Sequence, residues 1–260
     1  MRTMILWTLV ALLVQAAPAD EEFDKLVTEF NQARQAWYQE LHSRKDDGSA
    51  GGTKSPMPPR PSQVFLPRFR AYAEKHAGTP EAIGALVYVI NLAAPGGPQA
   101  KPGAGGGDVS WAIEQLTQHH AADAALREHL PDLQYSFYEI GKKPLIRFYE
   151  RVIEVNKDKE IAATAMFNLA FTLMHAGPTR ADAEQRADEK KRAARLFRQI
   201  RKEYPGTSAA ERAAGYIFEM EHLQIGMKAP DLAGEDVEGH TIKLSQFRGQ
   251  VVVLDFWGFW

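Results

Sequence analysis

The sequence predicts a mainly α-helical chain that ends in the first β elements of an α/β fold. Apolar residues recur at spacings of three and four along most of the 260 residues, as on the buried faces of helices. After residue 224 this period gives way to Gly and Pro punctuation, short alternating runs and one continuous apolar run, which are typical of strands. A hydrophobic content of 45% is enough to bury a core, so the chain is predicted to be globular.

Residues 1–19 predict a signal peptide. Arg2 is followed by an apolar run and then by small residues that suit cleavage after Ala16 or Ala19. The run is too short to span a bilayer as a permanent helix, so export is expected. The alternatives are an ordinary amphipathic first helix or an uncleaved membrane anchor, and membrane contact is expected only through such an anchor.

Charge and cysteine content exclude several classes of function. The net charge is −2 at pH 7 and the Lys and Arg residues form no block, so nucleic acid is not an expected partner. The absence of cysteine excludes disulfides, thiolate metal sites and thiol catalysis within these residues. The histidines lack the spacings of a metal site, adjacent His119 and His120 included, so solvated or capping histidines are expected. Neither a metal nor another cofactor is predicted.

Residues 20–60 predict an N-terminal helix followed by a flexible linker. Phe23, Leu26, Phe30 and Trp37 mark the apolar face of a helix over residues 20–43, and Gly, Ser and Pro dominate the stretch after it. A second stretch of this kind covers residues 94–108. Residues 105–107 do not follow a strand and lack the Lys of a phosphate loop, so both stretches are interpreted as spacers.

Residues 61–224 predict a helical domain. Thr79 and Asp108 are expected to cap two of its helices, further helices cover residues 143–158 and 159–177, and a turn at Pro205 and Gly206 joins the last two. Alanines at positions where helices cross, such as Ala165 and Ala213, favour helical hairpins. Such hairpins are similar to tetratricopeptide repeats, and an irregular helical domain is the alternative. In either case the domain offers a docking surface for a protein partner.

Residues 225–260 predict the start of a different domain. A turn is expected around residues 235–240, a short strand at residues 241–244, and a strand covered on both faces from Val251. An alternative for the last strand is the edge of a small hairpin, which would expose much apolar surface. We therefore expect these residues to be the truncated N-terminal part of a larger sheet domain.

The stretch "GMKAPDLAGEDVEGHTIKLSQFRGQVVVLDFWGFW" resembles the opening of the thioredoxin-like domain of TlpA/ResA-type redoxins. In that family a "G…AP" lead-in, a "dG…LS…rGk" series and a strand ending in "FWA.W" precede a Cys-x-x-Cys motif. The resemblance implies an exported thiol-disulfide oxidoreductase, periplasmic or in the cell envelope, that acts on protein thiols or disulfides. Its nucleophilic cysteine would be residue 261, so these 260 residues are expected to be an inactive fragment.

The same resemblance implies roles for three residues. Asp255 matches a buried acid that exchanges a proton with the dithiol, and its apolar neighbours Leu254 and Phe256 independently predict desolvation. An Asp that escapes to solvent is the alternative. Trp257 and Trp260 match aromatics that shield the dithiol, while core packing alone would also explain them. Gly258 and Phe259 depart from the family pattern of Ala and a polar residue.

Two other functions remain open from the sequence. A peroxiredoxin-type thiol peroxidase would use one thiolate to reduce a peroxide. A non-catalytic helical-repeat binding protein would keep the helical domain and carry a redoxin-like segment without cysteines. The residues at positions 261 to 264 distinguish these alternatives from a Cys-x-x-Cys oxidoreductase.

Overall fold

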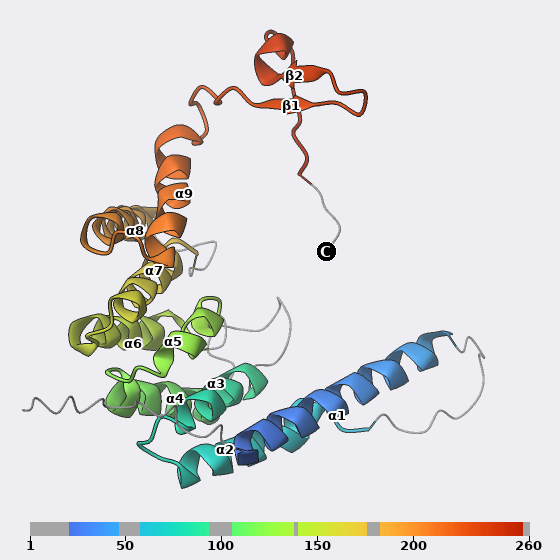
Figure 1. Cartoon of the computed structure of the whole chain (residues 1–260), viewed down its shortest axis with the longest axis vertical. Helices are drawn as coiled ribbons and strands as arrows, with labels where there is room; N and C mark the ends of the chain where they lie inside the picture. The colour runs from blue at the N-terminus through green and yellow to red at the C-terminus, as the bar shows by residue number, and fades with distance from the viewer. Residues whose placement is uncertain (1–20, 47–57, 94–105, 138–139, 176–182, 257–260) are drawn as a thin grey trace, which may run out of the picture.

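The computed structural model describes residues 21–46, 58–93, 106–137, 140–175 and 183–256 (Figure 1). As the sequence predicted, these residues are mainly helical and include the first β elements, a two-stranded antiparallel sheet. The elements in chain order are α1 (Glu21–Asp46), α2 (Pro61–Lys75), α3 (Ala82–Ala93), α4 (Gly106–Gln115), a π-helical turn η1 (Leu116–His120), α5 (Leu126–His129), η2 (Pro131–Leu133), α6 (Lys142–Val155), α7 (Lys159–His175), α8 (Ala183–Glu203), α9 (Ser208–His222), β1 (Ala233–Glu235), β2 (Thr241–Lys243) and η3 (Leu244–Phe247).

The predicted signal peptide, residues 1–19, lies outside the described residues. In the part of the chain that is described, every helix is too short or too polar to cross a bilayer.

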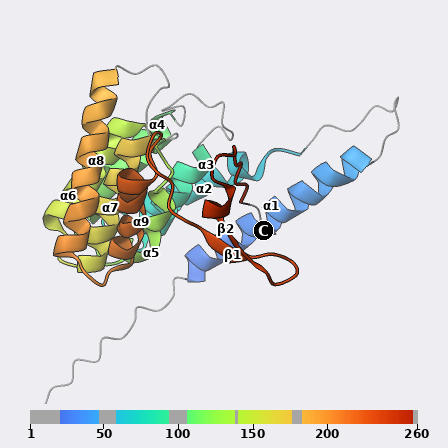
Figure 2. The same cartoon turned by 90° about the horizontal axis from the view of Figure 1, so that it is seen from above.

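Helix α1 packs its N-terminal half on α2 and α3. The Phe30 ring lies 5.6 Å from that of Phe65 and the Phe23 ring 5.4 Å from that of Tyr72, measured between centroids. The C-terminal end of α1 runs away from the other helices (Figure 2). The helix predicted over residues 20–43 is confirmed, and its aromatic face belongs to the same core as α2 and α3. The boundary between residues 20–60 and 61–224 stays a prediction.

From α2 to α9 the helices pack mostly on their neighbours in sequence and form a rising stack (Figure 1). Helix α7 is buried on nearly all sides, as its almost uniformly apolar sequence requires. Small residues such as Ala165 and Ala170 let adjacent helices approach closely, and the Phe197 ring stacks on that of Tyr216 at 4.8 Å. The predicted turn between α8 and α9 is confirmed; regular tetratricopeptide repeats stay a prediction.

Buried polar side chains of α6 and α7 form hydrogen bonds with the irregular segment around α5 and η2. The Tyr149 hydroxyl donates to the Leu133 carbonyl oxygen at 2.8 Å, and the Asn168 amide donates to that of Leu130 at 2.9 Å. Because burial disfavours a phenolate, it raises the pKa of Tyr149 above its ordinary value. Each of these carbonyls also accepts a local backbone N–H, from Ser136 and Leu133 respectively, so the side chains of α6 and α7 add a second bond that joins them to this segment.

The two expected caps are not formed. The Thr79 hydroxyl donates to the His76 carbonyl oxygen at 3.0 Å, beside the Thr79 backbone N–H at 3.1 Å, and α3 begins at Ala82. Asp108 lies inside the first turn of α4, where it pairs with Arg70. Arg70 also lies 4.6 Å above the Trp111 ring, so the acid joins α4 to α2.

The expectation of solvated or capping histidines is wrong for His120. This residue ends the π-helical turn η1 and is 1% exposed. Its Nδ1 lies 3.4 Å from the Asp123 carboxylate. The extra residue of a π turn rotates the side chains that follow it, which accounts for an imidazole on the inner side of an otherwise polar stretch.

Candidate functional site

The segment after α9 folds as a hairpin whose turn is fixed by one carboxylate. Strands β1 and β2 pair with Gly234 opposite Ile242. The Asp236 carboxylate accepts hydrogen bonds from the backbone N–H groups of Glu238 at 2.9 Å and His240 at 2.8 Å. Both bonds lower the pKa of Asp236, and the bond from His240 has the larger effect. Gly239 has φ +83°, a conformation that favours glycine. The turn predicted around residues 235–240 is therefore confirmed.

A second carboxylate ties the lead-in to the end of the hairpin. Asp231 accepts hydrogen bonds from the backbone N–H and the hydroxyl of Ser245, both at 2.8 Å. These two bonds lower the pKa of Asp231, with smaller contributions from Lys243 and Arg248. The Leu244 N–H donates to the Leu232 carbonyl oxygen at 2.8 Å. The "AP" lead-in and the "LS" pair of the sequence motif are thus held side by side.

Asp231 is a residue of this segment whose role the sequence did not reveal. The available signal was its position directly after Ala229 and Pro230, with a serine fourteen residues later. A short acidic side chain next to a proline commonly accepts backbone N–H groups in a turn.

The strand expected from Val251 is not formed. Residues 251–256 pair with neither β1 nor β2, and Val251 and Val253 are 97% and 87% exposed. A strand needs a hydrogen-bonded neighbour, and in the described part of the chain the ladder of β1 and β2 does not extend to these residues. Their apolar sequence is consequently left uncovered.

The predicted site residues are not brought together by the described structure. Asp255 is exposed, so the burial expected from its apolar neighbours is not observed; without a covered strand, nothing removes its carboxylate from water. Trp257 and Trp260 lie outside the described residues, as do Gly258 and Phe259. With no cysteine in the sequence, none of the 260 residues can supply a thiolate.

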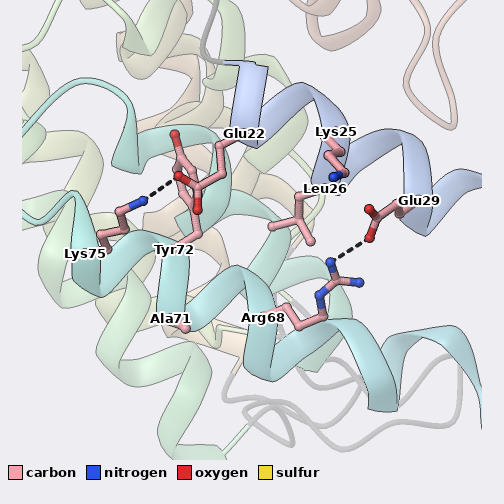
Figure 3. A pocket seen from close by; sticks show the side chains of 8 residues that line it. All are labelled: Glu22, Lys25, Leu26, Glu29, Arg68, Ala71, Tyr72 and Lys75. Carbon is pink, nitrogen blue, oxygen red and sulfur yellow. Dashed lines mark hydrogen bonds and ion pairs between the residues drawn. The ribbon is translucent and has the colours of Figure 1, made fainter.

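A hollow of about 410 Å³ lies between α1 and α2 (Figure 3). Ion pairs close it on two sides, between Arg68 and Glu29 at 2.6 Å and between Lys75 and Glu22 at 2.5 Å. Each hydrogen bond lowers the pKa of its glutamate. The other described residues that line the hollow provide no nucleophile with an adjacent base. We therefore interpret the hollow as part of the interface between α1 and α2.

One group of potential metal ligands occurs among the described residues. Ligand atoms of Asp236, Glu238 and His240 lie within 4.8 Å of one another. Asp236 already accepts two turn N–H groups, and His240 Nδ1 lies 3.3 Å from its carboxylate. These contacts explain the group as a hairpin turn, and the absence of a metal site stays a prediction.

A short stretch of this chain is similar to thiol-disulfide oxidoreductase ResA. Over 46 residues it is 44% identical to ResA of Bacillus thuringiensis subsp. konkukian and of Bacillus cereus, which covers 18% of this chain and 27% of each relative. ResA of Geobacillus kaustophilus is 40% identical over 45 residues, or 26% of its length. The matched part thus spans about a quarter of the length of ResA. No family model and no solved structure matches the chain.

Proposed function

We propose that this chain is part of an exported thiol-disulfide oxidoreductase of the thioredoxin-like redoxin type. The observation that carries the proposal is the short, specific similarity to ResA. The sequence motif of residues 226–260 supports it, because the residue that follows the "AP" pair, Asp231, bonds the serine of the "LS" pair, Ser245. Protein thiols or disulfides are the proposed substrates.

In this proposal residues 225–260 form the lead-in to the redox centre. A thiolate after residue 260 attacks a substrate disulfide, a mixed disulfide forms and one substrate sulfur leaves as a thiolate. A second cysteine then attacks the mixed disulfide, so that the other substrate sulfur leaves as a thiolate and the two cysteines end as a disulfide. Asp255 exchanges a proton with this dithiol once further strands cover residues 251–256, and Trp257 and Trp260 shield it from water. The 260 residues alone are proposed to be inactive.

A direct test compares residues 1–260 with the same chain extended by its native downstream residues. The extended protein should reduce or form disulfides in a protein substrate, whereas residues 1–260 should give only the background rate of the added thiol. Two cysteines at positions 261 and 264 are expected. A single cysteine with peroxide consumption would favour the peroxiredoxin alternative, and no cysteine would favour the binding protein.

The role of Asp255 has its own test in the extended protein. Replacement D255N should lower the rate of thiol-disulfide exchange by about 100-fold, the size of effect general acid–base catalysis supplies. Its pH profile should lose one inflection, which a purely structural effect would not cause. The replacement D236N, in the hairpin turn, is the matched control and should leave the pH profile unchanged.

Export and the helical region need separate experiments. Residues 1–19 fused to a reporter that is active only outside the cytoplasm should give reporter activity. An inactive reporter would contradict the proposed export. The helical region, residues 61–224, is proposed to dock a protein partner. Removing the helical region from the extended protein should slow thiol-disulfide exchange with a protein partner that docks on it. Exchange with small disulfide substrates should continue, because they need no docking surface.

A further inference from the structure

A groove of about 580 Å³ lies where the last helix meets the lead-in of the hairpin. We call it the junction groove; the residues that matter here are Phe218, His222, Lys228, Pro230, Leu244 and Arg248. They come from α9, from the lead-in and from η3 with the residue after it. Its volume lies within the range of pockets that hold small ligands or a few peptide side chains.

One wall of the groove is apolar. Phe218 lies on the last turns of α9 and is 47% exposed, and its ring centroid lies 4.8 Å from that of His222. The opposite face of α9 is buried in the helical core through Ala213 and Ile217. Phe218 therefore adds nothing to that core, and together with Pro230 it presents a surface on which an apolar side chain can pack.

The groove also carries positive charge. Lys228 and Arg248 line it, and within the described residues no carboxylate lies at ion-pair distance from either. Among the described residues that line the groove, the one acid is Asp231, which accepts two hydrogen bonds from Ser245 and whose pKa Arg248 helps to lower. Two cations and one carboxylate therefore line the opening, which leaves it with an excess of positive charge.

We propose that the junction groove binds an acidic segment of a partner polypeptide. An aromatic or aliphatic side chain of the segment packs on Phe218 and Pro230, and neighbouring carboxylates pair with Lys228 and Arg248. Such a segment contacts α9 and the hairpin region at once, so its binding favours one orientation of the two. The proposal stands on the groove itself and does not depend on the redox function.

The test uses two synthetic peptides and the full 260-residue chain. The acidic probe is acetyl-Glu-Phe-Glu-Leu-amide, and the neutral control replaces both Glu residues by Gln. Titration followed by amide chemical shifts should give a Kd at least about fivefold lower for the acidic peptide, as two exposed ion pairs supply. Raising the salt concentration from 50 to 500 mM should remove most of this difference, because salt screens exposed charges.

Variants then assign the site. The double replacement K228Q/R248Q should weaken the acidic peptide at least about fivefold and leave the neutral peptide unchanged. The matched control K202Q removes a cation from the last turn of α8 that does not line the groove and should change neither. The replacement F218A should weaken both peptides, and circular dichroism checks that each variant keeps its helices.

Four results would overturn the proposal. One is equal affinity for the acidic and neutral peptides. Another is a loss of affinity in K202Q as large as in the double variant. The third is self-association of the chain that F218A abolishes, since the groove would then belong to a second copy. No binding at millimolar peptide would also reject it.

Discussion

The helical region and the segment after α9 reach regular structure by different means. Buried apolar residues from Leu26 to Ile217 form one continuous cluster through the helices. In contrast, none of the residues 225–256 is buried, and the hairpin is held by strand pairing and by the carboxylates of Asp231 and Asp236. Burial stabilises the first region, while local hydrogen bonds order the second, and a two-stranded hairpin is marginally stable by itself.

The largest effect on stability is expected from replacing a buried phenylalanine, compared with an exposed one. Phe197 is fully buried against Phe167 and Tyr216, whereas Phe247 on η3 is 39% exposed. F197A should lower the free energy of unfolding by about 3–5 kcal/mol through lost burial and a cavity. F247A should lower it by less than about 1 kcal/mol. Denaturant unfolding followed by circular dichroism measures both, and similar losses would contradict the distinction.

Two helical glycines sharpen the comparison within the helical region. A Cβ at Gly84 would lie 2.7 Å from the Phe23 ring, so G84A should displace α1 and cost about 1–3 kcal/mol of unfolding free energy. A Cβ at Gly215 on α9 has no neighbour within 4 Å, and G215A should stabilise by up to about 1 kcal/mol. Thermal unfolding should shift in opposite directions. A stabilised G84A would show that α1 is not docked as described.

Acid should act on the helical region through His129. Burial lowers the pKa of this half-buried imidazole, against smaller opposing effects of Asp132 and Glu128. As the pH falls below about 6.5, the unfolded chain takes up the proton first, so the free energy of unfolding should decrease until the folded-state pKa is passed. H129Q should flatten this decrease. Unfolding at pH 8 and pH 5 measures it, and an unchanged difference would exclude His129 as the cause.

The smallest effect is expected in the hairpin region. D231A removes both hydrogen bonds to Ser245, so the amide of Ser245 should exchange its hydrogen several-fold faster. Global unfolding should stay unchanged, because Asp231 contributes nothing to the buried core. S245A, which keeps the backbone bond, should have a weaker effect. A global loss of stability in D231A would mean that the two regions are not independent.

Helices were predictable from the sequence because their signals are local. The three-and-four spacing located α1, α6, α7 and the pair α8 and α9, and the Pro205–Gly206 turn was read directly. The caps expected at Thr79 and Asp108 were wrong, because each side chain can bond several partners. The partners that they do bond, the His76 carbonyl and Arg70, come near only in the packed structure. The same holds for His120, whose burial follows from a π-helical turn that leaves no periodic mark.

The candidate site was less predictable than the helices. The turn at Asp236 follows from local chemistry, but the Asp231–Ser245 contact joins residues fourteen positions apart and needed the structure. The expected strand from Val251 failed because an apolar sequence permits a strand without providing its hydrogen-bonded neighbours. The burial expected for Asp255 depended on that strand and failed with it. The proposed proton transfer therefore rests on the family likeness.

The packing of each helix on its neighbours in sequence has a consequence for the order of folding. Contacts between nearby segments close short loops, so they form early and quickly. As the chain emerges from the N-terminal side, each newly completed helix finds its partner already in place. The helical stack up to α9 can thus assemble vectorially, before the lead-in and the apolar residues 251–256 appear. Those residues would then emerge beside a finished scaffold instead of a collapsing chain.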